Sequence, residues 1–97
     1  MARSHFIVIH KPGPDWDHDR DMREQHGWDA HAAFMDALTE DGFIVLGGPL
    51  GNGSEILLIV DSGSEDEIRA RLAEDPWAPV DLLRISSIEP WEVLLRA

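Results

Sequence analysis

Two short runs of apolar residues that do not alternate with polar ones constrain the fold of this chain most strongly. Phe6–Ile9 and Ile56–Val60 are rich in β-branched residues, a composition that favours β-strands. A strand with one face in water alternates apolar and polar side chains, whereas these runs are apolar on both faces. We therefore expect a sheet that is covered on both sides. Runs this short cannot span a bilayer or form the core of a signal peptide, so we expect no membrane association.

An amphipathic helix is predicted after the first strand. Trp28, His31, Met35 and Leu38 recur at intervals of three and four residues, which places their side chains on one face of a helix over about residues 27–41. A glycine follows this segment and is a common way for a helix to end.

A second helix is predicted between Ser64 and Asp75. Ser64 with Glu67 has the spacing of a capping box, in which each residue satisfies a free backbone N–H of the other. Pro76 disfavours a helical conformation of the residue before it, so we expect the helix to end at about Asp75.

The remaining strands complete a β-α-β-β-α-β order. Strands are expected at four segments: His5–His10, ending before Pro12; Phe43–Leu46; Ile56–Val60; and Leu82–Ile88, ending before Pro90. Gly47–Gly53 is interpreted as a loop whose Asn52-Gly53 pair is typical of a hairpin turn. The order is that of a ferredoxin-like α+β fold, an antiparallel sheet with two helices on one face, in a single domain over residues 1–97.

Two helices can cover only one face of such a sheet. The other face, together with an apolar tail that contains Trp91, Val93 and Leu95, needs another cover, and a second copy of the chain is the simplest one. We therefore predict a homodimer that packs sheet against sheet.

The charge of the chain narrows the choice of partners. Lys and Arg number 8 against 19 Asp and Glu, a formal net charge of −11, which repels phosphate backbones and anionic membranes. We expect no nucleic-acid binding, and small neutral or cationic molecules as ligands. The absence of cysteine excludes a disulfide framework and a thiolate nucleophile, and it fits a cytoplasmic protein.

Three motif-like segments do not fit the sites that they resemble. The glycine-rich segment Gly47–Gly53 leads into a strand, whereas a phosphate cradle opens into a helix. The acidic run Asp15–Asp21 lacks the glycine and the final glutamate of a calcium loop, so we interpret it as a solvated loop, with weak divalent-cation binding as the alternative. His26 and His31 lie on different sides of a helix. We therefore expect no metal site and no cofactor.

His31 and Asp75 are the candidate catalytic residues. His31 lies on the apolar face of the first helix, and in this topology Asp75 ends an element that packs beside that helix. A carboxylate that accepts a hydrogen bond from one imidazole nitrogen leaves the other nitrogen free to act as a base. The alternative is structural: His31 would be a buried histidine with a satisfied hydrogen bond, and Asp75 would belong to a turn at a helix end.

Two of the four tryptophans flank this pair in sequence. Trp28 precedes His31 by one turn, and Trp77 follows Asp75 by two residues. They are interpreted either as core or interface residues or as walls of a pocket for a flat ligand.

The chain also resembles a known family. The segments that carry the resemblance are His31-Ala-Ala-Phe-Met-Asp-Ala-Leu38, Gly42-Phe-Ile-Val-Leu-Gly-Gly-Pro-Leu50, Asp75-Pro76-Trp77 and Ile88-Glu-Pro-Trp91. In these segments the chain is similar to the YciI-like (YCII-related) family of the dimeric α/β-barrel superfamily. The resemblance implies a ferredoxin-like protomer, a dimer whose sheets form a barrel, and a cleft with a His-Asp pair at His31 and Asp75.

Three functions follow as hypotheses. The leading one is a small-molecule lyase or isomerase, with an aromatic or cyclic substrate, in which His31 is the general acid/base and Asp75 orients it. Its expected substrate-binding residues are Trp28, Gly47, Gly48, Pro49 and Trp77. The second is a dimer that binds a small ligand or regulates a partner without catalysis, for example beside a sigma factor, as the resemblance implies for some relatives. The third is a cofactor-free or haem-dependent oxygenase of the same superfamily.

Overall fold

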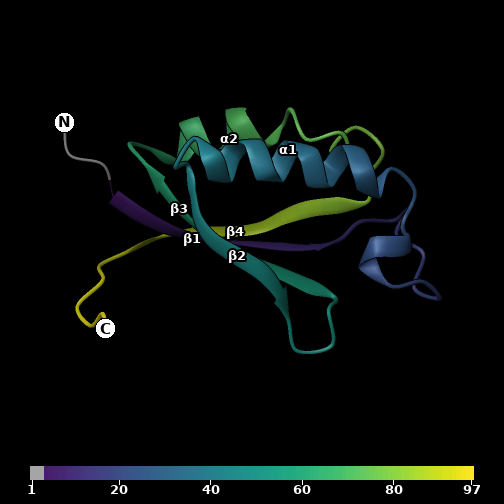
Figure 1. Ribbon diagram of the computed structural model, residues 1–97, viewed down its shortest axis with the longest axis horizontal. Helices are drawn as coiled ribbons and strands as arrows, with labels where there is room; N and C mark the ends of the chain where they lie inside the picture. Colours follow the sequence, from purple (N-terminus) through teal and green to yellow (C-terminus); the bar gives the residue numbers. More distant parts are fainter. Residues whose placement is uncertain (1–3) are drawn as a thin grey trace.

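A computed structural model describes residues 4–97 of the chain. Residues 1–3, the start of the expected domain, lie outside the described residues. The fold is α+β, with a four-stranded antiparallel sheet and two helices that lie on the same face of it (Figure 1). The elements are β1 (Ser4–Pro12), a short 3-10 helix (Met22–Glu24), α1 (Trp28–Glu40), β2 (Ile44–Leu50), β3 (Glu55–Ser62), α2 (Glu65–Leu72) and β4 (Leu83–Trp91).

The strand order β2-β3-β1-β4 puts the two apolar runs in the middle of the sheet. Val8 of β1 pairs with Leu58 of β3 on one side and with Ile88 of β4 on the other. Successive residues of these runs still face opposite sides of the sheet: Val8 is buried beneath the helices, whereas Ile7 and Ile9, on the other face, are only partly buried. The element order is compatible with a ferredoxin-like fold.

Two edge strands extend further than the sequence predicts. β2 continues through Gly48, which pairs with Leu57, to Leu50, and β4 continues through Pro90 to Trp91. The predicted ends at Leu46 and Ile88 are therefore wrong. Proline lacks a backbone N–H, but an edge strand has one side without a partner, so proline is tolerated there. The first strand likewise extends past the predicted stop, and Pro12 is its last residue.

Gly47 is needed for this extension of β2. A Cβ at this position would lie 2.9 Å from the carbonyl oxygen of Leu57 and 2.6 Å from a methyl carbon of Leu58. The predicted glycine loop therefore shrinks to a hairpin turn after Leu50. The turn at Asn52-Gly53 is confirmed, because the Gly53 N–H donates to the Leu50 carbonyl at 2.8 Å.

Three of the four helix ends lie where the sequence predicts them. α1 lies within the predicted range, between Gly27 and Gly42, which both have positive φ. At the start of α2 the Ser64 hydroxyl accepts from the Glu67 N–H at 3.1 Å. The predicted end at Asp75 is wrong, because α2 stops at Leu72 and the chain turns toward Pro76.

The two faces of the sheet differ in exposure. The core between the sheet and the helices includes Val8, Ile68 and Trp77, which are almost fully buried. On the sheet, Val45 is 45% exposed and Trp91 is 41% exposed, and both line an apolar hollow of about 590 Å³ outside the helical layer. A single chain therefore leaves apolar sheet residues in contact with water. Within residues 4–97, no helix has the length and apolar character that crossing a bilayer requires.

Candidate active site

His31 and Asp75 meet between the helical layer and the sheet. His31 lies in the first part of α1, and Asp75 lies in the turn that follows α2. The Nδ1 atom of His31 is 2.9 Å from both carboxylate oxygens of Asp75. Both side chains are only 6% exposed, so this contact is shielded from solvent.

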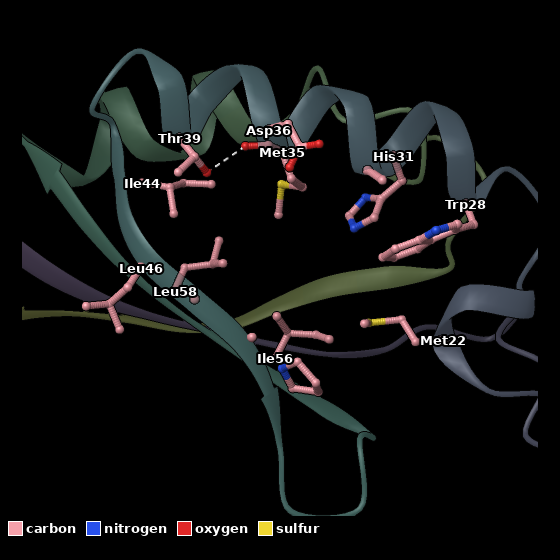
Figure 2. A pocket seen from close by; sticks show the side chains of 14 residues that line it. Met22, Trp28, His31, Met35, Asp36, Thr39, Ile44, Leu46, Ile56 and Leu58 are labelled. Carbon is pink, nitrogen blue, oxygen red and sulfur yellow. Dashed lines mark hydrogen bonds between the residues drawn. The ribbon is translucent and has the colours of Figure 1, made fainter.

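The hydrogen bond assigns different roles to the two ring nitrogens. A carboxylate only accepts hydrogen bonds, so the Nδ1–H of His31 is the donor. In the neutral ring the Nε2 atom then carries the lone pair, and it has no hydrogen-bond partner within residues 4–97. Figure 2 shows the ring extending from α1 into a cavity. This arrangement presents a base to the cavity.

Trp77 fixes both members of the pair. Its backbone N–H donates to Oδ1 of Asp75 at 2.9 Å, which is a short-range bond within the Asp75-Pro76-Trp77 turn. Its indole ring stacks on the His31 ring, with centroids 3.8 Å apart and planes at 7°. The indole N–H donates to the carbonyl of His26 at 2.7 Å. Rotation of the His31 ring is therefore restricted by Asp75 at one edge and by Trp77 on one face.

The cavity in front of His31 has a volume of about 500 Å³, within the range of small-ligand sites. It lies between α1 and the strands β2 and β3 (Figure 2). Its walls are mainly apolar, and the lining residues are Met22, Trp28, His31, Ala32, Met35, Asp36, Thr39, Ile44, Leu46, Gly47, Gly48, Pro49, Ile56 and Leu58.

Four of the five expected substrate-binding residues line this cavity: Trp28, Gly47, Gly48 and Pro49. Trp77 is not among the lining residues and is 1% exposed, because it lies against His31 in the core. Its contacts are those of a residue that holds the pair, not those of a cavity wall.

Several lining residues were missed by the sequence reasoning. Ile44 on β2 and Ile56 on β3 line the cavity. Leu46 touches its rim, but it pairs with Ile59 and also lines the apolar hollow on the other face of the sheet. Asp36 follows Met35 on α1 and brings a carboxylate to the cavity. Asp36 lies one helical turn beyond Ala32 and therefore on the same side of α1, which was the signal available in the sequence.

His10 was also missed. It is 5% exposed, and its Nδ1 atom has no hydrogen-bond partner within residues 4–97. Burial lowers the pKa of His10 from 6.5 to about 4, while the Asp75 carboxylate opposes the shift and His31 adds to it. His10 follows Val8 at the two-residue period of a strand, which was a signal that it faces the helices.

The acidic segment before α1 is held in place by its few buried residues. The Gln25 side chain accepts from the Asp17 N–H at 3.0 Å and donates to the Asp17 carbonyl at 2.7 Å. Asp15, Asp17, Asp19 and Asp21 are exposed. In the part of the chain that the structure describes, no group of three or more histidine, cysteine or acidic side chains is arranged to hold a metal ion.

No protein-family model matches the chain, and no curated protein matches it either.

Proposed function

We propose that this protein is a lyase or isomerase that acts on a small molecule, with His31 as the general acid/base and Asp75 as the residue that orients it. One observation carries the proposal: the Nδ1–H of His31 is bound to a buried carboxylate at 2.9 Å while Nε2 is directed to a cavity. General acid–base catalysis of this kind contributes typically about 10²–10⁴-fold in rate.

The proposed step begins at an acidic C–H of the bound substrate. The Nε2 lone pair takes the proton, and the electron pair of the broken C–H bond forms a new double bond. In a lyase, a leaving group on the adjacent carbon departs with its bonding electrons. In an isomerase, the electrons shift along the substrate and the His31 imidazolium returns the proton to another carbon. Asp75 stabilises the imidazolium through the Nδ1–H.

The cavity supports an aromatic or cyclic substrate. Trp28 and Ile56 offer flat or apolar contact area, and the absence of side chains on Gly47 and Gly48 leaves the β2 backbone open to a ligand. The exposed Asp36 carboxylate at the cavity and the net charge of −11 disfavour an anionic substrate. A neutral molecule with hydrogen-bond donors fits best.

We further propose that the chain is a YciI-like protein of the dimeric α/β-barrel type and that it works as a homodimer. Support comes from the antiparallel sheet with both helices on one face and from the apolar sheet residues that a single chain leaves exposed, such as Val45 and Trp91. A second copy would remove these residues from water.

The test follows proton transfer directly. The protein is incubated in D₂O with a panel of hydroxylated cyclic ketones, hydroxylated lactones and chlorinated hydroquinones, and NMR records deuterium uptake and halide release. We expect at least one compound to react, and we expect His31→Gln to lose the reaction by about 10²-fold or more. His18→Gln, which removes an exposed histidine of the acidic loop, is the matched control. Turnover that survives in His31→Gln refutes the proposed role.

A second candidate is a dimer that binds a small ligand without catalysis. The mainly apolar walls of the cavity favour it, because they retain a ligand by burial alone. Binding of a panel compound that is equally tight in wild type and His31→Gln, with no reaction in either, would decide for this candidate.

A further inference from the structure

The cavity in front of His31 has a carboxylate at its opening. Within residues 4–97, Asp36 is the only acidic residue that lines this cavity, and no lysine or arginine lines it. Asp36 is exposed, so it lies where the cavity meets solvent, and it forms no ion pair in the described part of the chain. A carboxylate accepts hydrogen bonds and donates none. The proposed reaction gives this acceptor no role.

Thr39 adds a second acceptor beside Asp36. Residues three apart on a helix are neighbours, with about 5–6 Å between their Cβ atoms. The Thr39 hydroxyl donates to the Met35 carbonyl at 2.9 Å, so its proton is already used and its oxygen can only accept a hydrogen bond from a ligand. Figure 2 draws this bond and shows Asp36 and Thr39 past His31 along α1. The two side chains therefore offer acceptors at the same part of the cavity.

The spacing of His31 and Asp36 limits the size of a ligand that reaches both. Asp36 follows His31 by five positions on α1, a rise of about 7.5 Å along the helix axis. Met35 on α1 and Ile44 and Leu58 on the facing strands make this stretch of the cavity apolar. A ligand that contacts both residues thus has an apolar middle of about one ring, with its reacting carbon at His31 and a second group at Asp36.

We infer that Asp36 is a specificity residue, whose carboxylate accepts a hydrogen bond from a hydroxyl or amino group on the side of the substrate ring opposite the reacting carbon. Thr39 is the second acceptor for the same group. The inference rests on the proposed function and narrows it, because it names the substrate class: a ring that bears a hydrogen-bond donor away from the carbon that loses its proton.

The selection has an attractive and a repulsive part. A ring that enters the cavity displaces water from the Asp36 carboxylate, and a hydroxyl or amino group replaces that water as the donor. A group without a proton to donate leaves the carboxylate with fewer hydrogen bonds than it had in water. An anionic group on the ligand adds repulsion between like charges, which discriminates against it further.

A series of four probes with one ring tests the inference without turnover. Benzyl alcohol is a neutral donor, benzylamine is a cationic donor, benzyl methyl ether has no donor, and benzoate is an anion. NMR spectra of protein with ¹³C-labelled methionine methyl groups follow each titration at Met22 and Met35, which line the cavity. We expect the probes to shift these signals, and the titrations give a Kd for each probe. Whether the alcohol or the amine binds more tightly distinguishes a neutral from a cationic donor.

Asp36→Ala is expected to change the four Kd values in different directions. Its Kd should rise about 3- to 10-fold for the alcohol and the amine, since a hydrogen bond to a charged acceptor is lost. The Kd of the ether should stay the same, and that of benzoate should fall because the repulsion is removed. Asp29→Ala, at another exposed acidic position of α1 that does not line the cavity, is the matched control and should leave the Kd of the alcohol unchanged.

Three results would overturn the inference. They are an alcohol that binds Asp36→Ala as tightly as wild type, an equal loss of alcohol binding in Asp29→Ala, and Met22 and Met35 signals that none of the probes shifts. A loss confined to the amine falls under the first, because the charge alone then explains it. Activity that persists in His31→Gln would refute the catalytic role and leave these binding results as they are, so the two failures are distinguishable.

Discussion

Acidification is expected to destabilise the wild-type protein more than a His10→Leu variant. Burial lowers the pKa of His10 in the folded chain to about 4, whereas the unfolded chain has the ordinary value of 6.5. Between these values the unfolded state binds more protons than the folded state, so the free energy of unfolding falls as the pH falls. The loss begins near pH 6.5 and is complete only below pH 4.

The size of this effect follows from the linkage of protonation and folding. Each pKa unit corresponds to about 1.4 kcal/mol, so the full shift is worth about 3 kcal/mol, of which about 2 kcal/mol is lost between about pH 7.5 and pH 5. Measurements stop near pH 5 because the isoelectric point is about 4.6 and a protein without net charge associates. Leucine does not titrate, so His10→Leu lacks this contribution.

Urea unfolding at fixed protein concentration measures the difference. Tryptophan fluorescence gives the free energy of unfolding of wild type and His10→Leu at the two pH values, and His18→Leu, at an exposed position, controls for the loss of an imidazole. We expect wild type and His18→Leu to lose about 2 kcal/mol more than His10→Leu. Equal losses in wild type and His10→Leu would refute the argument that burial keeps His10 neutral.

Three further predictions concern the sheet and the pair. Gly47→Ala is expected to lower the free energy of unfolding by about 1–3 kcal/mol, because its Cβ would meet the β3 backbone. The control in the same urea titration is Gly48→Ala, whose Cβ meets nothing within 4 Å. Equal losses in the two variants would contradict the packing argument. Val45→Glu is expected to convert the dimer to a monomer, as measured by light scattering. Ala33→Glu, at an exposed position of α1, is expected to keep the mass of the dimer. A dimer that persists in Val45→Glu would argue against the sheet face as the interface. Asp75→Asn is expected to lower the free energy of unfolding by about 1–3 kcal/mol at neutral pH, since it replaces the charged acceptor of a buried hydrogen bond by a neutral amide oxygen. A stability equal to wild type in thermal unfolding would show that the charge of the acceptor contributes nothing.

Hydrophobic spacing predicted the elements of this fold, while the ends of the strands depended on their neighbours. The intervals between Trp28, His31 and Leu38 predicted α1, because helix geometry acts over a few residues. The lengths of β2 and β4 were not predictable from local sequence. A proline inside a central strand removes a hydrogen bond of the sheet, whereas Pro49 and Pro90 lie in edge strands, where proline is tolerated. Only the completed sheet shows which strands lie at the edge.

The sequence predicted the His31-Asp75 pair but not all of the residues around it. His31 stood out because a titratable side chain interrupts an apolar helix face, and Asp75 because it precedes a proline. Whether the two side chains meet depends on how α1 and the turn after α2 pack together. The spacing of residues along the sequence does not give that distance. His10 is in the site only because β1 lies at the centre of the sheet beneath Asp75.

Trp77 links the stability of the domain to the geometry of the pair. It is one of the largest fully buried side chains, and the same residue donates to Asp75, stacks on His31 and binds the His26 carbonyl. Removing it would create a cavity in the core and release the pair at once, so its variants cannot separate stability from function. His10 is different, because its Nδ1 atom makes no hydrogen bond within residues 4–97 that a substitution would break. It is therefore the position at which the electrostatics of the site can be changed while the packing around Trp77 is kept.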